Sequence, residues 1–201
     1  MPRLIIRTPR LELIAAEPDV ALAEAAGTAD WWRALSVPAP SSWPPPLNDV
    51  DSVAWFARNI ADDPSALGWF TWYVVHPQGV GRALIGSCGF KGRPDTRGSV
   101  EIGYGLLADH QRQGFGTELT SALVGWAFGH PPVARVLAET LPQLVGSVRV
   151  LEKNGFQLLG RGSTQDTILF ELRRTVFEQR ARHAIGAGRP QFPTPNAQLP
   201  K

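Results

Sequence analysis

Residues 101–119 decide the fold, and they read EIGYGLLADHQRQGFGTEL. Through Leu107 the stretch has the alternation of a β-strand, and from Leu119 onward apolar residues recur at helical spacing. A polar loop that contains Gly114 and Gly116 joins the two parts. A strand that turns through such a loop into a helix leaves backbone N–H groups free at the positive end of the helix dipole. The stretch therefore predicts a site for a phosphate or pyrophosphate.

Three nucleotide-binding patterns can be tested against this loop. A P-loop requires a lysine after its second glycine, but Thr117 follows Gly116 here. A Rossmann fingerprint requires a third glycine, which the continuation Thr-Glu-Leu lacks. The pattern that fits is Gln-x-x-Gly-x-Gly, from Gln111 to Gly116, whose glycines would let a ligand approach the backbone. On this pattern alone, an ordinary strand–turn–helix connection with glycines for tightness is an equal alternative.

Other segments of the chain favour the ligand-binding interpretation. VEIGY at residues 100–104, LAET at 137–140 and SVRVLEKNGF at 147–156 accompany the loop sequence QRQGFGTEL. As a set they resemble the GCN5-related N-acetyltransferases, most closely the branch of ribosomal-protein-alanine and small-amine acetyltransferases, over residues 4–173. The resemblance implies an α+β fold, the acyl-CoA N-acyltransferase fold, with a mixed, mostly antiparallel central sheet flanked by helices. It also implies a splayed strand pair at the acyl-CoA site and acetyl-CoA as co-substrate.

The resemblance further implies which residues hold CoA. The backbone of Leu106 and Leu107 should run along the pantetheine arm, and Ser147 should lie near the thiolate as a candidate catalytic residue. The other cofactor-binding residues belong to the pyrophosphate loop and the start of its helix: Gln111, Arg112, Gln113, Gly114, Phe115, Gly116 and Thr117. Leu144 and Leu151 stand where the family has an asparagine and a tyrosine that protonates the thiolate. The proton for the leaving group is therefore left to Ser147, to water or to no residue.

Glu101 is the strongest candidate for the catalytic base. On a strand it shares one face with Gly103 and Gly105, so its carboxylate can look into an open cleft. Its position also resembles that of the superfamily's strand glutamate, which deprotonates the amine directly or through water. A solvent-facing carboxylate paired with a nearby arginine is the alternative. Glu139, at the end of the strand that borders the acyl site, is the second candidate base and a candidate substrate-binding residue.

The acceptor side is expected in residues 31–47, which combine three tryptophans with five prolines. The prolines exclude a regular helix, and the tryptophans are too apolar to leave in water. Trp31 and Trp43 are candidates for the wall of an acceptor pocket, although they could equally bury one another. Such a wall favours an acceptor with an uncharged or aromatic part. Tyr104 and Cys88 are expected to be core residues.

The remaining pattern predicts one domain, residues 1–176, and a basic, Pro/Gly-rich tail, residues 177–201, that is mobile from about 185. A helix that follows Asn48 or Asp49 as its cap is expected to run through Trp55 and Ile60. The predicted strands are 4–6, 11–14, 69–75, 83–90, 100–107, 135–140 and 167–173, and the other predicted helices are 19–26, 116–128 and 145–154.

Composition limits the classes of function. A chain of 201 residues with 43% hydrophobic content can bury one sizeable core. Its single cysteine excludes an intrachain disulfide and a Cys-rich metal cluster, and no metal is expected. No apolar run is long enough for a membrane span and no signal peptide is visible, so the cytoplasm is the expected compartment. The net charge of +2 comes from dispersed charges without aromatic interleaving, which makes nucleic-acid binding unlikely.

These observations lead to an acetyl-CoA-dependent N-acetyltransferase as the predicted function. The acceptor is a primary amine of a small molecule or a protein N-terminus, which attacks the thioester directly in a ternary complex. The alternative is a non-catalytic acyl-CoA-binding or sensing protein on the same fold, favoured by Leu144 and Leu151. A monomer or a homodimer is expected.

Overall fold

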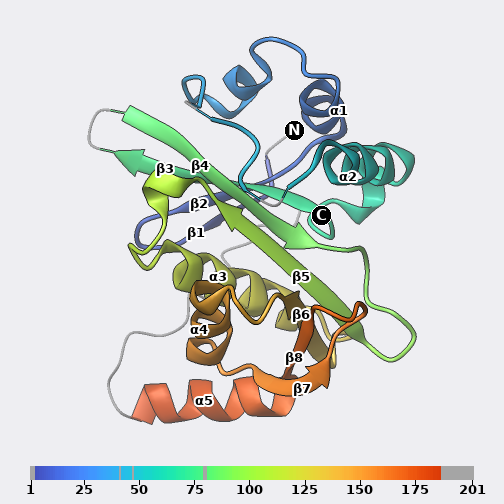
Figure 1. The fold of residues 1–201 in the computed structure, drawn as a ribbon, viewed down its shortest axis with the longest axis vertical. Helices are drawn as coiled ribbons and strands as arrows, with labels where there is room; N and C mark the ends of the chain where they lie inside the picture. Colours follow the sequence, from blue (N-terminus) through green and yellow to red (C-terminus); the bar gives the residue numbers. More distant parts are fainter. Residues whose placement is uncertain (1–2, 41, 47, 79–80, 187–201) are drawn as a thin grey trace.

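The computed structural model describes residues 3–40, 42–46, 48–78 and 81–186. These residues form an eight-stranded sheet in the order β1-β2-β3-β4-β5-β6-β8-β7 (Figure 1). Among the sheet neighbours, β5 and β6 run parallel and the other pairs run antiparallel. The predicted α+β fold with a mixed, mostly antiparallel sheet is therefore confirmed.

The elements follow the predicted ones closely, with two additions. The strands are β1 (Ile5–Arg7), β2 (Glu12–Ala15), β3 (Thr71–Gln78), β4 (Gly81–Phe90), β5 (Ser99–Leu106), β6 (Arg135–Thr140), β7 (Gln157–Arg161) and β8 (Ile168–Arg173). The helices are α1 (Pro18–Ala25), α2 (Val50–Asp62), α3 (Phe115–Phe128), α4 (Val145–Lys153) and α5 (Arg174–Gly186), with short 3₁₀ turns η1 (Trp31–Leu35), η2 (Pro64–Ala66) and η3 (Ala108–His110). β7 and α5 are the additions.

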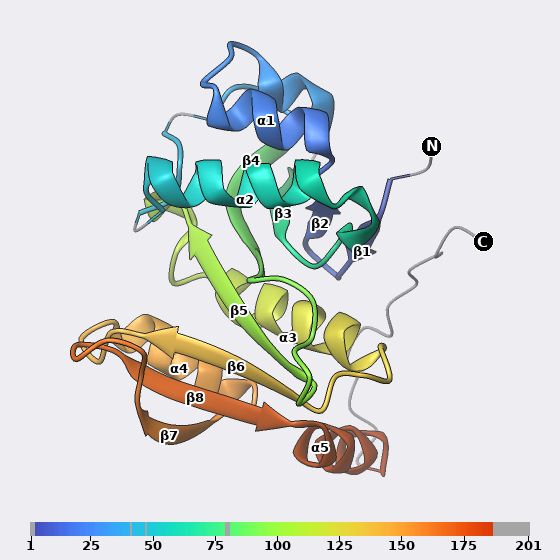
Figure 2. The same ribbon diagram turned by 90° about the vertical axis from the view of Figure 1, so that its right-hand side faces the viewer.

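The sheet lies between two layers of helices. α1 and α2 pack together over one face, while α3 and α4 cover the other (Figures 1 and 2). The predicted cap of α2 is Asp49, whose side chain accepts a hydrogen bond from the Ser52 N–H at 2.7 Å. On α3, Leu119 and Leu123 are fully buried, and each such burial stabilises the fold by about 1.5–3 kcal/mol.

The parallel pair β5 and β6 stays together over only part of its length. Its register runs from Ser99↔Arg135 to Ile102↔Ala138, after which the strands diverge in a V (Figure 2). The closed end is held by Arg135, whose Nε donates to Ser99 Oγ at 2.8 Å and whose Nη1 donates to Glu171 Oε1 at 3.1 Å. This is the predicted splayed strand pair, and it leaves an opening between the two halves of the sheet.

The end of the described chain differs from the prediction. The predicted tail starts at residue 177, but α5 continues through that point and packs on the domain. The Phe177 ring lies 4.9 Å from that of Phe128, and Arg180 Nη2 donates to the Lys153 carbonyl at 2.9 Å. Residues 187–201, most of the segment predicted to be mobile, lie outside the described residues.

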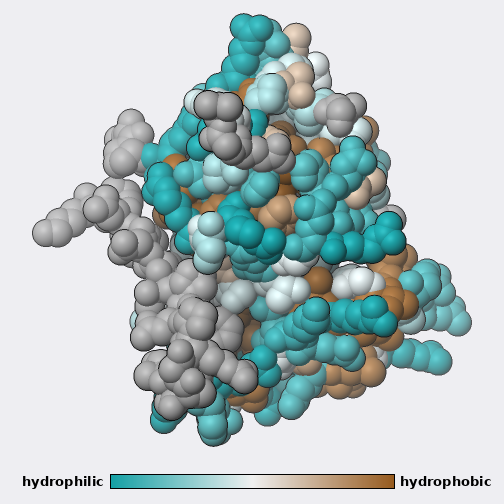
Figure 3. All heavy atoms as spheres, turned by 90° about the vertical axis from the view of Figure 1, so that its left-hand side faces the viewer, coloured by the Kyte–Doolittle hydropathy of each residue, from teal (hydrophilic) through white to brown (hydrophobic). Residues whose placement is uncertain are grey.

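Membrane-spanning helices and metal-binding clusters are both absent from the described residues. No helix there is long and apolar enough to cross a membrane. The same ranges hold no group of three or more His, Cys, Asp or Glu side chains placed to bind a metal ion. On the face shown in Figure 3, hydrophobic residues lie in scattered patches among mainly hydrophilic ones.

Candidate active site

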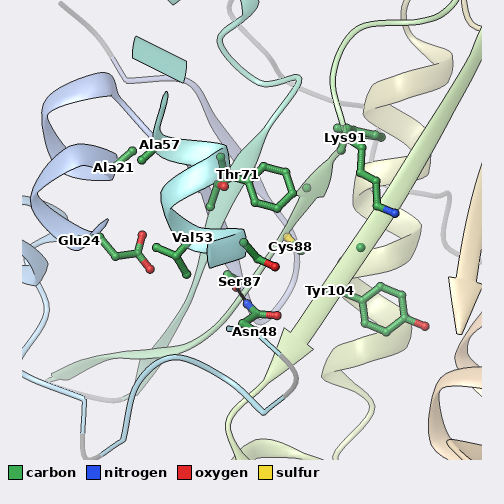
Figure 4. A pocket seen from close by; sticks show the side chains of 15 residues that line it. Ala21, Glu24, Asn48, Val53, Ala57, Thr71, Ser87, Cys88, Lys91 and Tyr104 are labelled. Atoms are coloured by element: carbon green, nitrogen blue, oxygen red, sulfur yellow. Dashed lines mark hydrogen bonds between the residues drawn. The ribbon is translucent and has the colours of Figure 1, made fainter. Parts of the chain in front are cut away.

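A cavity of about 170 Å³ lies between the α1–α2 layer and strands β3 to β5 (Figure 4). The helices and the segment before α2 contribute Glu24, Asn48 and Ser52, and the strands contribute Ser87 and Gly103. Lys91, which follows β4 directly, lies at the opposite end from Glu24. The cavity thus touches β5 where that strand has no β6 partner.

Two glycines of β5 differ in their surroundings, and of the two Gly103 lines the cavity. A Cβ atom at Gly103 would meet nothing within 4 Å, whereas one at Gly105 would lie 3.0 Å from Pro45 Cβ. The proline-rich segment therefore roofs Gly105 and leaves Gly103 open. Asn48 Nδ2 fixes the same segment to the sheet by donating to Ser87 Oγ at 2.9 Å. These contacts place the proline-rich segment over strands β4 and β5.

Glu101 lies on the predicted face of β5, beside Gly103. Its carboxylate forms an ion pair with the Lys91 ammonium, and its side chain is 26% exposed. The partner is thus a lysine that itself lines the cavity, instead of the arginine considered from the sequence. The ion pair occupies Glu101, so an acceptor amine or a water must reach the carboxylate beside or in place of Lys91.

Glu139 has a different role from the one predicted for it. Its carboxylate accepts hydrogen bonds from Ser163 N at 2.7 Å, Ser163 Oγ at 2.8 Å and Thr167 Oγ1 at 3.1 Å. Partial burial would raise the pKa of Glu139, but these hydrogen bonds and the charge of Lys91 outweigh it and hold the pKa below its usual value. The residue ties down the β7–β8 connection and does not line the cavity.

The predicted tryptophans stand behind the cavity and do not line it. Trp31 is 8% exposed, with its ring 5.4 Å from Trp43 and 5.2 Å from Tyr73. Trp43 Nε1 donates to Glu24 Oε1 at 2.7 Å. The two tryptophans therefore pack largely against each other and the core, which was the alternative considered from the sequence. Trp43 is connected to the cavity only through its hydrogen bond to Glu24.

Sequence reasoning missed Glu24. It lies on α1 three and four residues after the buried Ala21 and Val20, so helical spacing puts it on the inner face. An acidic residue on the inner face of a predicted helix is a signal that could have identified it from the sequence. Its Oε2 accepts from the Tyr73 hydroxyl at 2.6 Å. Burial raises the pKa of Glu24, while the hydrogen bonds from Tyr73 and Trp43 act in the opposite direction.

The loop before α3 offers its backbone to a ligand. Gly114 is the N-cap at φ 85°, a left-handed conformation that favours glycine, and no side chain caps the helix. Glu118, the acidic residue of the first turn, is engaged by Thr8 Oγ1 at 2.6 Å and Arg10 Nε at 2.7 Å. The first N–H groups of α3 therefore remain available to an anion.

Several predicted cofactor-binding residues have internal roles. Gln111 Nε2 donates to the Leu106 carbonyl at 3.0 Å, and Gln113 Nε2 donates to the Asp109 carbonyl at 2.8 Å. The Leu107 N–H is used by the Ile85 carbonyl at 2.8 Å. Arg112 is exposed at φ 59°.

Two residues at the start of α3 require a correction. Phe115 is 3% exposed and packs against Arg10 and His76, so its side chain belongs to the core. A Cβ atom at Gly116 would lie 3.2 Å from Val150 Cγ2, so this glycine permits close packing of α3 on α4. Its predicted purpose was ligand approach. Thr117 uses its carbonyl as an acceptor for Asn154 Nδ2 at 3.3 Å.

Ser147 lies in the first turn of α4 and faces β5. The Tyr104 hydroxyl lies 3.1 Å from Ser147 Oγ and 3.3 Å from its carbonyl oxygen. Burial raises the pKa of Tyr104 to about 12. Tyr104 was predicted as core, but it is half-buried and reaches Ser147, while Leu151 at the family's tyrosine position is 1% exposed.

Comparison with known proteins identifies the family. The family model described as "Acetyltransferase (GNAT) domain" matches residues 3–157. The chain is 28% identical to an uncharacterized N-acetyltransferase, YjdG, of Bacillus subtilis (strain 168) over 157 residues, which cover 77% of this chain and 90% of that protein.

Solved structures share the fold at lower identity. The ribosomal-protein-S5-alanine acetyltransferase from Vibrio fischeri gives a TM-score of 0.61 at 16% identity, covering 85% of this chain and 96% of that one. The microcin C7 self-immunity acetyltransferase MccE, in complex with acetyl-CoA and AMP, gives 0.56 at 15% identity, covering 83% and 93%. The match over most of the chain shows that this protein belongs to the GNAT family of acetyltransferases and is an N-acetyltransferase.

Proposed function

We propose that the protein transfers the acetyl group of acetyl-CoA to a primary amine of a small molecule or a protein N-terminus, by direct attack in a ternary complex. The observation that carries this proposal is the contact of the cavity with Gly103, on the part of β5 that β6 does not cover. Beyond Ile102, β5 and β6 are no longer hydrogen-bonded, so the space above the sheet is not closed off from the space below it. An amine that enters from the α1–α2 side can therefore meet a thioester held in the opening.

The proposed CoA site uses mainly backbone groups. The free N–H groups at the start of α3 would bind the pyrophosphate, with exposed Arg112 and Gln113 beside it. The pantetheine arm would follow β5 from Gly103 to Leu106, whose edge lacks a strand partner. Such an edge offers unpaired peptide groups that suit the amides of pantetheine.

Glu101 is the proposed base. Attack by the amine nitrogen on the thioester carbon requires a neutral amine, so the proton of the ammonium must go to a carboxylate or a water. Glu101 is beside Gly103, whose missing side chain leaves room for the amine. Because Lys91 contacts the same carboxylate, the acceptor would displace the lysine or act through a water.

Ser147 is the proposed partner of the leaving thiolate, and Tyr104 is its positioning residue. With a pKa of about 12, the Tyr104 phenol holds its proton more tightly than a thiol of ordinary pKa, about 8.5. Transfer of the phenol proton to the thiolate is therefore energetically uphill. The sulfur would leave as an anion when its bond to the acetyl carbon breaks, and Ser147 Oγ, held by Tyr104, would donate a hydrogen bond to it.

A screen of acetyl-CoA turnover across amino acids, polyamines, aminoglycosides and short peptides tests this function. We expect thiol release that depends on the amine and that produces the acetylated acceptor by mass spectrometry. Acetyl-CoA binding without turnover on any acceptor would instead favour an acyl-CoA-binding protein. We extend the proposal to the cytoplasm, since buried, unpaired Cys88 suits a reducing compartment, and to a monomer or homodimer, which light scattering would decide.

A further inference from the structure

The carboxylate of Glu24 is the charged group at the α1 end of the cavity. It is half-buried and points from α1 toward the cavity (Figure 4). Trp43 Nε1 donates to one oxygen at 2.7 Å and the Tyr73 hydroxyl donates to the other at 2.6 Å. Both donors come from distant segments, so the carboxylate is held in a fixed orientation.

These two donors are neutral, and the charge of Glu24 has no counter-ion. Of the ion pairs formed by the residues that the structure describes, none includes Glu24. The partly buried carboxylates of Glu12, Glu118 and Glu171 each contact an arginine. Burying a carboxylate without a cationic partner is unfavourable, and neutral hydrogen bonds compensate only in part. A cation in the cavity would remove this deficit.

The carboxylate also has unused hydrogen-bonding capacity. Its two oxygens can accept about four hydrogen bonds, and the structure supplies two. Tyr73 is itself fully buried behind the carboxylate. The remaining lone pairs are therefore the ones available to a ligand in the cavity.

The opposite end of the cavity carries a cation that is already paired. Lys91 lines that end beside Gly103 and contacts Glu101. Because the Glu101 carboxylate already pairs with Lys91, Glu24 is the carboxylate lining the cavity that has no cationic partner among the described residues, and a second ammonium is expected at Glu24. With about 170 Å³, the cavity is far larger than the roughly 15 Å³ that one water needs, so it can hold a short chain of atoms between the two ends.

We propose that Glu24 binds a second cationic group of the acceptor, so that the preferred acceptors are small aliphatic diamines, acetylated at the amine that reaches Gly103. This inference rests on the proposed function and names its substrate class. It also revises the sequence-based expectation of an acceptor with an uncharged or aromatic part, because the tryptophans behind that expectation do not line the cavity. Their contribution is to hold the carboxylate.

Paired amines of equal length test the charge requirement. Each linear diamine is compared with the monoamine in which a methyl group replaces the second amino group, for example 1,5-diaminopentane with hexylamine. A charged hydrogen bond in a partly buried site predicts that wild-type kcat/KM is about 10- to 100-fold higher for the diamine. Glu24→Gln, which keeps the shape and removes the charge, should bring that ratio to about 1, mainly by lowering kcat/KM for the diamine.

Two variants separate recognition from structure. Asp19→Asn removes a charge from the exposed side of α1 and should leave the ratio unaltered. Tyr73→Phe removes one donor and keeps the Glu24 charge, so the preference for the diamine should persist even if the protein becomes less stable. Loss of the preference in Tyr73→Phe but not in Glu24→Gln would overturn the inference, as would equal losses for both amines in Glu24→Gln.

Calorimetry in the presence of CoA supplies a readout that does not depend on turnover. 1,5-Diaminopentane should bind the wild-type protein about tenfold or more tightly than hexylamine, and Glu24→Gln should abolish the difference. If diamine binding follows Glu24 but no amine is acetylated, the proposed reaction fails and the cation site stands. If amines are acetylated and hexylamine serves as well as the diamine, the cation site fails and the reaction stands.

Discussion

The two regions proposed to bind ligands use different chemical groups. The loop before α3 and the open edge of β5 present backbone groups, and their side chains mostly serve the fold. The cavity under α1 and α2 presents side chains, such as Glu24 and Asn48, that distant partners hold in place. A backbone site of this kind suits a constant co-substrate, because its shape depends little on residue identity. A side-chain site can change its specificity with one substitution.

Removing the base should have the largest effect and should spare the backbone site. Glu101→Gln keeps the shape of the side chain and removes its basicity, so turnover should fall about 10²- to 10⁴-fold near neutral pH while acetyl-CoA binding persists. Steady-state kinetics and calorimetry measure the two quantities. Glu12→Gln is the matched control, since Glu12 is also a strand carboxylate paired with a cation but lies on β2, three strands away from β5 in the sheet. Near-normal turnover in Glu101→Gln would remove Glu101 as the base.

The backbone site should respond to backbone geometry. Gly114→Val places a branched side chain at φ 85° and beside the free N–H groups, so CoA should bind at least about tenfold more weakly, or about 1.4 kcal/mol. Gly27→Val, at φ 62° with open space around its Cβ position, carries a similar backbone strain away from the site. It should lower stability and leave CoA affinity intact. Equal weakening of CoA in both folded variants would attribute the effect to general destabilisation.

The pair Tyr104 and Ser147 joins the two regions through a side-chain contact and should have a smaller effect. Ser147→Ala should lower kcat roughly tenfold, as expected for the loss of one hydrogen bond to a charged group. Tyr104→Phe should lower it less, because Ser147 remains. The double variant should be no worse than Ser147→Ala alone, since Tyr104 acts through Ser147. Additive losses would mean that Tyr104 contacts the reacting groups itself.

The smallest expected effect is on stability and comes from Glu24. Its pKa is raised in the folded state, so its contribution to stability is fully present below the unfolded pKa, near 4.5, and is lost as the pH rises through the folded value. Glu24→Gln does not titrate. The Tm of Glu24→Gln should therefore rise relative to that of the wild type as the pH increases from acid to mildly alkaline, and should exceed it once Glu24 is ionised in the wild type. A Tm difference that does not change with pH would show that the buried charge carries no such cost.

The sequence predicted the backbone site better than the cavity for a physical reason. The strand, the glycine loop and the helix that form the first are contiguous, and glycine, strand alternation and helix starts are local signals. Even there, the sequence did not show that Val150, from a helix more than thirty residues later, packs against Gly116. The glycine at position 116 was visible in the sequence, but its contact with Val150 was not.

The cavity depended on contacts that no local pattern encodes. Glu24 meets Trp43 and Tyr73 across 19 and 49 residues of chain, and Tyr104 meets Ser147 across 43. Strand alternation placed Tyr104 on the correct face without showing that α4 sets a hydroxyl opposite it. β7 and α5 were missed because β7 is mostly exposed and α5 is mostly polar, so neither has a marked apolar period.

Arg135 holds the closed end of the V between β5 and β6, and it thereby influences the position of the open end, which it does not contact. β5 extends four residues past Ile102, its last pair with β6, a length of about 13 Å at roughly 3.3 Å per residue. A tilt of about 5° at the closed end moves the open end by about 1 Å, a displacement that can cost a reaction on the order of 10²-fold in rate. The hydrogen bonds from Arg135 to Ser99 and Glu171 thus fix the angle at which β5 leaves β6. That angle sets the position of the strand edge proposed to hold the thioester.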